Sequence, residues 1–247
     1  MGKFKLVIIL ILSILILSCG KAKPKLRIGL NADYPPFEFM QDQVLTGLDV
    51  EMAHKLAESI GYDLQFVRME FDELLPALLN NRIDLAISAI TINPQRQQIV
   101  DFSIPYFSAD QSLITVEDSS IKVDQLEDIA NYNIGFQNGT TGQYFLQFNL
   151  VEKGVLSWEN LSAFDNNNQA ISALMNNEID MLILDDSAAK CFSTIKPLKI
   201  VHLIKTDEQY GIAMRKDYEL KDNINTALSQ IINSNYWTSL VTKYLGN

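Results

Sequence analysis

The sequence predicts an α/β protein built from two similar lobes. In residues 25–89, strand-like and helix-like segments alternate, and residues 133–185 repeat this alternation. The two halves also share a local phrase, since Ala77–Asp84 (ALLNNRID) resembles Ala173–Asp180 (ALMNNEID). In each copy a helix ends, an asparagine pair turns the chain, and Ile-Asp opens a strand. Alternating strands and helices indicate a parallel sheet with helices on its faces.

The first elements of the first half follow from local pattern. Residues 25–30 alternate polar and apolar side chains, as a strand does. Pro35 and Pro36 then favour an extended turn over a helix. Residues 48–57 carry apolar side chains at helical spacing, and Gly61 is suited to end that helix.

Three more elements complete the first half. Residues 64–67 are predicted to form the next strand, and residues 84–89 a buried one. Between them, residues 74–79 are predicted to form a short helix, because Pro76 is tolerated in a first helical turn. The resulting β-α-β-α-β order predicts one lobe.

The second half repeats this order. Residues 133–137 form a strand-like segment that ends in the polar turn 138–142, with a helix after it. Residues 170–175 are helical in pattern, and residues 179–185 form a strand ending on a carboxylate. This half predicts the second lobe.

Four polar segments come directly after predicted strands. They are residues 31–37, 88–96, 138–142 and 185–186. Ligands of open α/β sheets bind beyond the carboxyl ends of the strands. We therefore expect these segments to line one cleft between the lobes.

The N-terminus has the pattern of a bacterial export signal. Lys3 and Lys5 precede an apolar run over residues 6–17, which is shorter than the ~20 residues of a membrane-spanning helix. The run ends at Leu17-Ser18-Cys19-Gly20, which resembles a lipobox. We expect residues 1–18 to be a signal peptide, Cys19 to carry the lipid (palmitate), and 19–24 to be the tether. This predicts an extracytoplasmic lipoprotein, anchored to a bacterial membrane.

Composition and motifs exclude several other classes of function. The formal net charge is −10, and no basic cluster follows the first 25 residues, so nucleic acid is a poor partner. The two histidines and two cysteines show no metal-binding spacing. The Asn138–Gly142 turn lacks the lysine of a nucleotide-binding loop. We therefore expect no metal and no cofactor.

Five segments, in order, together resemble one family. The polar amino-acid-binding proteins of ABC importers, the bacterial extracellular solute-binding proteins of family 3, carry similar segments over nearly the whole length from about Lys25 to Gly246. The segments are ADYPPFEF (32–39), GLDVEM (47–52), DLAISAIT (84–91), RQQ through DFSIPY (96–106) and GTT (139–141).

The resemblance implies a bilobed periplasmic-binding-protein fold of type II, with two α/β lobes joined by a two-strand hinge. We expect lobe 1 to comprise residues 25–112 and 206–247, and lobe 2 residues 113–205. It also implies a monomer that binds a free amino acid between the lobes. The partner is an ABC permease in the inner membrane.

A free amino acid brings a carboxylate, which is costly to bury without partners. Arg96 suits it, because a guanidinium grips two oxygens through a planar fork. In the family, an arginine five residues after the Ser/Thr segment has this role, and Arg96 stands five after Thr91. Thr141, with Thr140 beside it, lies at a strand-to-helix turn whose amides favour anions.

The ammonium requires an acceptor. By resemblance this is Asp185, assisted by the Ser88 carbonyl and the Thr91 hydroxyl. Asp186 is the competitor, because adjacent residues of a strand point to opposite sides. Ala89 departs from relatives that carry serine there, which removes one polar contact.

The ligand side chain is expected against Tyr34 and Phe71, although Phe71 could instead be a core residue. Asn31 stands where relatives that bind lysine, arginine or histidine carry aspartate. Gln137 at the end of the pocket supplies no charge either. These residues predict a neutral polar amino acid as ligand.

One enzymatic alternative uses the same fold. Cyclohexadienyl dehydratases share this architecture and use cleft carboxylates as acids, a role open to Asp185, Asp186 or Glu38. No residue is marked in the sequence as such an acid, so we predict no catalytic residue and a binding protein. A sensing role would use the same site.

Overall fold

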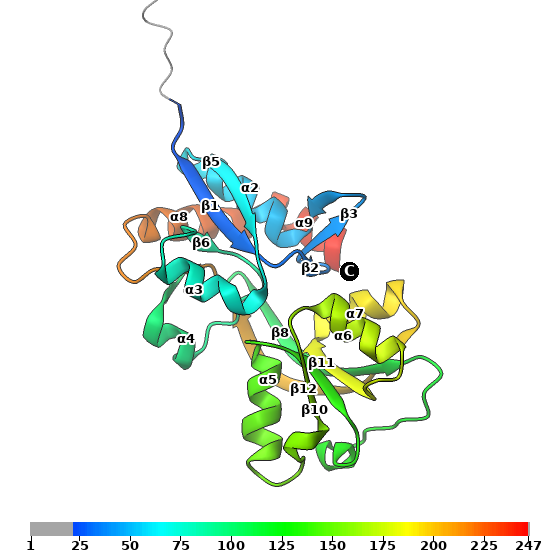
Figure 1. Ribbon diagram of the computed structural model, residues 1–247. Helices are drawn as coiled ribbons and strands as arrows, with labels where there is room; N and C mark the ends of the chain where they lie inside the picture. The colour runs from blue at the N-terminus through cyan, green and yellow to red at the C-terminus, as the bar shows by residue number, and fades with distance from the viewer. Residues whose placement is uncertain (1–21, 247) are drawn as a thin grey trace, which may run out of the picture.

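The computed structural model describes residues 22–246, which form two α/β lobes (Figure 1). The bilobed α/β fold expected from the sequence is confirmed. The predicted signal peptide (1–18) and the lipidated Cys19 lie outside the described residues. Within 22–246, none of the helices has the length and apolar character needed to cross a membrane.

Lobe 1 is built around a five-stranded sheet of order β5-β1-β6-β13-β7. Helices α2, α8 and α9 pack on one another beside this sheet, and α3 contacts β1 and β6. A small antiparallel sheet, β2-β3-β4, precedes α2. The elements are β1 (Lys25–Leu30), β2 (Asp33–Tyr34), β3 (Glu38–Gln41), β4 (Val44–Thr46), α2 (Leu48–Ile60), β5 (Asp63–Arg68), η2 (Phe71–Glu73), α3 (Leu74–Leu79), β6 (Leu85–Ala86), α4 (Pro94–Ile99), β7 (Asp101–Phe102), β13 (Ala213–Met214), α8 (Lys221–Ile232) and α9 (Asn235–Leu245).

Lobe 2 is built around a second five-stranded sheet, of order β10-β9-β11-β8-β12. Helix α6 contacts β9, β10 and β11, α7 contacts β8 and β12, and α5 contacts β9 and β11. The elements are β8 (Phe107–Val116), η3 (Leu126–Ile129), β9 (Ile134–Gln137), α5 (Thr141–Phe145), the π-helical η4 (Leu146–Val151), η5 (Trp158–Asn160), β10 (Leu161–Phe164), α6 (Asn167–Met175), β11 (Met181–Asp185), α7 (Asp186–Ile195) and β12 (Leu198–Tyr210).

The sheets are mixed, which corrects the expectation of parallel sheets. In lobe 1, β1 lies parallel to β5 and β6, as predicted, but β13 runs antiparallel to β6 and β7. In lobe 2, β9 is parallel to β10 and β11, while β8 is antiparallel to β11 and β12. The antiparallel strands belong to, or directly follow, the segments that cross between lobes, so their direction is set by the crossing.

The similar sequence segments Ala77–Asp84 and Ala173–Asp180 have the same turn structure in the two lobes. The second asparagine of each pair, Asn81 or Asn177, has a left-handed backbone (φ 55° and 59°), a conformation that asparagine tolerates better than most residues. The Asp84 carboxylate accepts the Arg27 amide at 2.8 Å, and the Asp180 carboxylate accepts the Asn133 amide at 2.7 Å. Each aspartate thus ties its turn to the neighbouring parallel strand.

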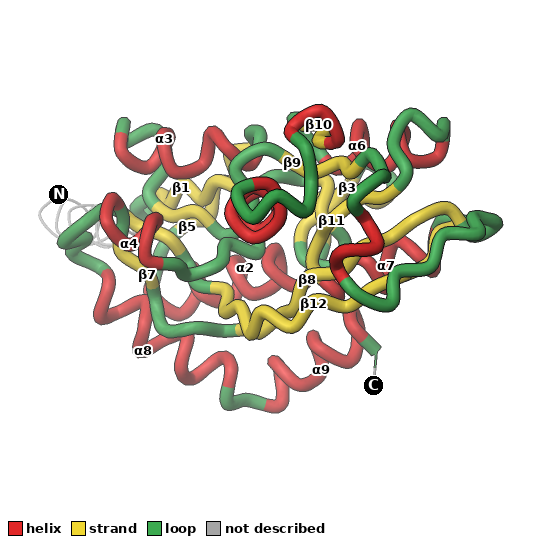
Figure 2. Tube along the Cα trace, turned by 90° about the horizontal axis from the view of Figure 1, so that it is seen from below, coloured by secondary structure: helices red, strands yellow, loops and turns green. Residues whose placement is uncertain are grey.

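Strands β8 and β12 connect the lobes and lie side by side between them (Figure 2). They pair from Leu198 opposite Val116 to Tyr210 opposite Phe107. The predicted lobe boundaries, after residue 112 and before residue 206, fall inside these two strands. Two antiparallel strands form a narrow connection, which can bend while each lobe keeps its own core.

Candidate functional site

The four polar segments come together in one cavity between the lobes. The empty space between its lining residues, open solvent included, is about 470 Å³. All eleven residues predicted to contact ligand line it: Asn31, Tyr34, Phe71, Ser88, Ala89, Thr91, Arg96, Gln137, Thr140, Thr141 and Asp185.

Arg96 lies at the start of lobe 1's short helix α4 and is only 7% exposed. Asn93 caps that helix by accepting the Arg96 amide at 2.8 Å. The guanidinium donates to the Thr91 carbonyl at 2.8 Å and, across the cleft, to the Gly139 carbonyl at 2.9 Å. Burial lowers the pKa of Arg96 from its ordinary value. A carboxylate ligand would stabilise this poorly solvated cation.

Thr140 and Thr141 come from lobe 2, at the turn between β9 and α5. The Thr140 side chain caps α5, accepting the Gln143 amide at 3.2 Å and donating to the Gln137 carbonyl at 2.8 Å. The Thr141 amide, as the first of α5, has no partner inside the helix. Gly139 has φ +76°, and a Cβ there would lie 3.0 Å from the Asp72 Cβ of lobe 1. The turn therefore brings backbone close to both the cavity and the opposite lobe.

Asp185 ends β11 and is 8% exposed. Its carboxylate accepts hydrogen bonds from Gln111 and Tyr210, which come from the two hinge strands, and its amide donates to the Tyr34 hydroxyl at 3.1 Å. Burial, and then the charge of Glu208, raises the pKa of Asp185 to about 7. A cation bound there would favour the ionised form.

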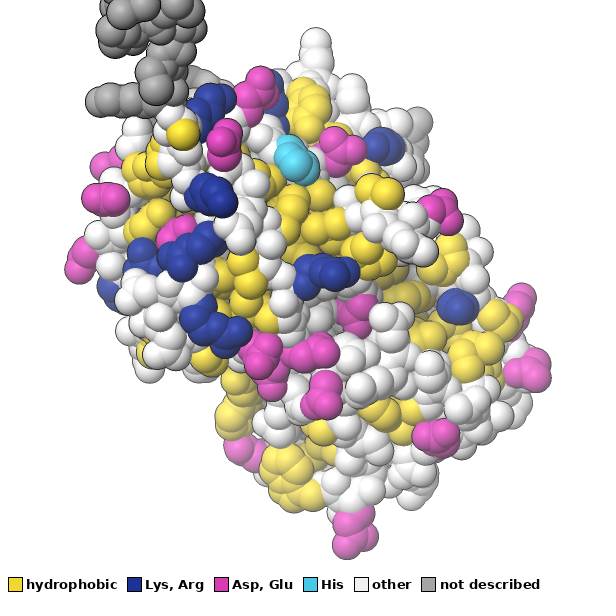
Figure 3. Space-filling view, turned by 45° about the horizontal axis from the view of Figure 1, so that its top comes forward, with side chains coloured by type: hydrophobic (Ala, Val, Ile, Leu, Met, Phe, Trp, Pro, Cys, Tyr) yellow, Lys and Arg dark blue, Asp and Glu magenta, His cyan; other side chains and the backbone are white. Residues whose placement is uncertain are grey.

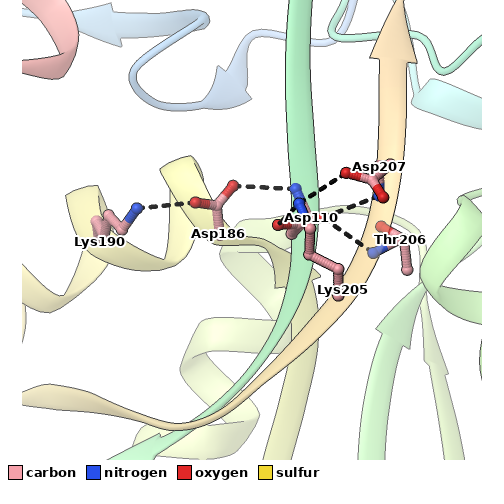
Figure 4. Close-up of polar contacts among 6 residues, drawn as sticks. All are labelled: Asp110, Asp186, Lys190, Lys205, Thr206 and Asp207. Carbon is pink, nitrogen blue, oxygen red and sulfur yellow. Dashed lines mark hydrogen bonds and ion pairs between the residues drawn. The ribbon is translucent and has the colours of Figure 1, made fainter.

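Asp186 is directed away from the cavity, which separates the two candidate carboxylates. It accepts the Asp110 amide at 3.2 Å and pairs with Lys190 at 2.8 Å on the hinge side (Figure 4). It is not among the cavity-lining residues.

Two buried carboxyl groups, those of Glu38 and Asp49, hold Ser88 and Ala89 in place through hydrogen bonds. Ser88 donates its hydroxyl to Glu38 at 2.6 Å and accepts the Asn31 amide at 3.0 Å. Asp49 accepts the amide of Ala89 at 2.8 Å, which holds Ala89 at φ 46°. Burial raises the pKa of Asp49 to about 6, and burial together with the charge of Asp49 raises the pKa of Glu38 well above its ordinary value.

Phe71 lies both at the cavity and against the core of lobe 1. Its ring lines the cavity and packs against the lobe 1 core cluster around Leu74 and Ile83. The Arg96 guanidinium lies over the same ring, 5.4 Å from its centroid, as a cation–π pair. The ring therefore supports the arginine from one side.

The far end of the cavity is lined by amides. Gln137 accepts from the Asn167 side chain at 2.7 Å. Asn31 donates to the Met69 carbonyl at 3.2 Å and to Glu70 at 3.3 Å, while its buried side-chain oxygen has no protein partner. That oxygen is a free acceptor beside the cavity.

Several functional candidates were missed in the sequence. Ile183 adds apolar wall, and Gln111 and Asn167 add polar groups. Gly142 from the expected polar turn, Leu184 from the predicted strand 179–185, and Glu38, named above as a possible acid, also line the cavity. Gln111 and Glu208 are polar residues of the hinge strands, and only their nearness to the predicted lobe boundaries at residues 112 and 206 could have singled them out. No cluster of three or more metal-ligating side chains occurs among residues 22–246.

The sequence profile of the bacterial extracellular solute-binding proteins, family 3, matches residues 26–247. The chain belongs to this family. ArtP of Bacillus subtilis, an arginine-binding extracellular protein, is 32% identical over 217 residues, which cover 85% of this chain and 81% of ArtP. The family is one of solute-binding proteins that act outside the cytoplasm, as predicted.

Solved structures share this fold over most of their length. A mutant of ArgBP from T. maritima has a TM-score of 0.84 and 34% identity, covering 90% of this chain and 96% of that one. An ancestral arginine-binding protein bound to glutamine has a TM-score of 0.82 and 32% identity, covering 91% and 99%.

On the face in Figure 3, basic side chains gather on the upper lobe and acidic ones are scattered over both lobes. These basic side chains belong to a protein whose formal net charge over the whole sequence is −10.

Proposed function

We propose that this solute-binding protein captures a free L-amino acid between its lobes and delivers it to an ABC permease. The observation that carries the proposal is that a buried cation, Arg96, and a buried carboxyl group, Asp185, line the same cavity. Arg96 and the Thr141 amide serve the α-carboxylate, and Asp185 with the Ser88 carbonyl serves the α-ammonium. Each charge of the ligand thus meets a buried partner of opposite sign or a backbone dipole.

The ligand proposed is a neutral polar amino acid, with glutamine as the first candidate. Asn31, Gln137 and Asn167 contribute uncharged amides to the lining, and these are the groups proposed to meet the ligand side chain. The free oxygen of Asn31 suits an N–H donor on the ligand. A relative in this fold has been described bound to glutamine.

Arginine is the second candidate, favoured by Glu70. This carboxylate accepts from Asn31 and Asn166 at 3.3 Å each, directly behind the amide wall. A ligand long enough to displace the Asn31 amide would meet that negative charge. Several relatives, such as ArtP, are named for arginine.

Thermal shift of the purified protein against the twenty amino acids, followed by calorimetric titration, tests capture and names the ligand. A ligand that binds only the folded state raises the melting temperature. Glu70→Gln separates the two candidates, because it weakens arginine binding and leaves glutamine binding unchanged. If none of the twenty amino acids raised the melting temperature and the protein instead converted prephenate, the assignment would change to a cyclohexadienyl dehydratase, with Glu38 or Asp185 as the acid.

The lipoprotein state is part of the proposal. Cys19 stands at the end of a signal-like segment, within a lipobox-like sequence. Labelling cells with radioactive palmitate should mark the wild-type protein and not Cys19→Ser. Equal labelling of both would remove Cys19 as the anchor.

A further inference from the structure

We propose that Glu208 is a positioning residue of the amino-acid site: it accepts hydrogen bonds from the hydroxyl groups of Thr91 and Thr141 and thereby joins the two lobes. The amino-acid part of this inference rests on the proposed function, whereas the joining of the lobes does not. Glu208 does not line the central cavity but lies behind the two threonines, beside a neighbouring surface pocket that it shares with Thr141.

One carboxylate oxygen of Glu208 accepts hydrogen bonds from both threonine hydroxyls. Thr91 donates to Oε2 at 2.6 Å and Thr141 donates to the same atom at 2.7 Å. The other oxygen, Oε1, accepts from Gln111 at 3.2 Å. Charge-assisted hydrogen bonds of this length are among the stronger polar contacts in proteins.

Glu208 is carried by the lobe 1 end of the hinge. The Ile92 amide donates to the Gln209 carbonyl at 2.8 Å, and the Gly211 amide donates to the Ile90 carbonyl at 3.0 Å. Thr91 and Glu208 are therefore tied together through their backbones. The Thr141 bond to Glu208, in contrast, reaches over to lobe 2, so it forms only while the lobes are together.

A bulge in β12 sets the position of Glu208. Pairing with β8 is irregular between Ile204 and Glu208, and Asp207 in this interval has φ 50°. The Asp110 carboxylate accepts the amides of Thr206 and Asp207 at 2.9 Å each (Figure 4). These bonds give the two unpaired backbone amides of the bulge a hydrogen-bond acceptor. Regular pairing with β8 resumes at Glu208, which lies opposite Ala109.

The bonds to Glu208 also fix what the two hydroxyls can offer the ligand. A hydroxyl has one proton, and a carboxylate only accepts. With both protons directed to Glu208, the Thr91 and Thr141 hydroxyls can only accept further hydrogen bonds, and Thr141 already accepts one from Gln111 at 3.4 Å. The Thr91 hydroxyl is then an acceptor for the ligand ammonium, and the Thr141 contribution to a carboxylate is left to its backbone amide.

Two measurements test this role, with Glu208→Gln as the variant and Asp207→Asn as the control. Asp207→Asn removes the same charge one residue away, at a side chain that is 77% exposed and pairs only with Lys205. Asparagine also tolerates the left-handed backbone there. Circular dichroism and melting curves establish that both variants fold.

The first measurement is hydrogen exchange of the ligand-free protein, followed by mass spectrometry. The amides of Asn168 and Asp185 are bonded across the cleft to Asp33 and Tyr34, so their exchange reports separation of the lobes. Exchange there should be several-fold faster in Glu208→Gln and unchanged in Asp207→Asn. Equal exchange in wild type and both variants would overturn the joining role. This arm needs no ligand, so it stands even if no amino acid binds.

The second measurement compares the bound amino acid with its des-amino analogue by calorimetry. A glutamine side chain can donate to one threonine, which frees that hydroxyl to donate into the cleft. The preference for the amino acid over the analogue should therefore fall about tenfold in Glu208→Gln, the worth of one charge-assisted hydrogen bond. An unchanged preference in a folded variant would overturn the effect on hydroxyl polarity, whereas absence of binding in the wild type would instead overturn the proposed function.

Discussion

Arg96 is a buried cation beside the cavity, and in residues 22–246 its guanidinium donates to the Thr91 and Gly139 carbonyls rather than to a carboxylate. We expect Arg96→Ala to weaken amino-acid binding by ~2–5 kcal/mol, the usual cost of removing one partner of a buried charge pair. Arg96→Lys keeps the charge and loses the fork, so it should recover only part of the affinity. Arg82→Ala, at an exposed turn, is the control for loss of a cation. Wild-type affinity in Arg96→Ala would show that the carboxylate binds elsewhere.

Asp185 makes binding depend on pH. It must be ionised to pair with an ammonium, and its pKa of about 7 reflects burial first and the charge of Glu208 second. Below this pKa, binding requires removal of a proton, so the dissociation constant should rise about tenfold between pH 8 and pH 6. Titration calorimetry at both pH values checks this, and Asp185→Asn should bind weakly with no such dependence. A flat profile in the wild type would contradict the assignment of Asp185 to the ammonium.

The residues of the site were predictable where they belong to segments shared with a family. Resemblance to the family, together with the chemistry of a free amino acid, pointed to Arg96, Thr141 and Asp185, and the structure brings them into one cavity. The choice between Asp185 and Asp186 could not be made as firmly, because it depends on hinge contacts such as the Asp110 amide. Glu208 was missed because its partners lie 67 and 117 positions away in the sequence.

At the scale of elements, the turn before α5 is where lobe 2 approaches lobe 1. Gly139→Ala adds a Cβ 3.0 Å from the Asp72 Cβ, besides the strain of a φ of +76°. Gly154→Ala carries the same strain, with φ +74°, and meets no atom within 4 Å. We expect both variants to lose a similar ~1 kcal/mol of stability, and only Gly139→Ala to bind about tenfold more weakly. Urea unfolding and calorimetry separate the two effects, and equal affinities would mean that the turn does not limit closure.

The elements themselves were largely predictable. The first strand and the short helix begin and end where the pattern put them, at Lys25–Leu30 and Leu74–Leu79. Gly61 ends α2 in a left-handed conformation, as its position indicated. The antiparallel strand β13 was not predictable, because two residues carry little periodicity and their direction depends on a distant crossing.

At the scale of the whole molecule, ionisation of Asp185 should favour ligand binding and lower the stability of the ligand-free protein. Its folded pKa lies above the ordinary value of 3.8. The stability that its protonated form contributes is therefore fully present below pH 3.8 and is lost as the pH rises through about 7. At pH 8 the ionised, buried carboxylate costs the free protein about 2–4 kcal/mol.

Asp185→Asn removes that cost while keeping the shape of the side chain. We expect the ligand-free variant to melt several degrees above the wild type at pH 8 and at the same temperature near pH 4. Asp186→Asn, whose carboxylate pairs with Lys190 at the surface, should show no such gain. The amino acid should raise the melting temperature of the wild type at pH 8 but not that of Asp185→Asn. A variant less stable than the wild type at pH 8 would mean that the bonds from Gln111 and Tyr210 outweigh burial, and that the carboxylate serves the fold as well as the ligand.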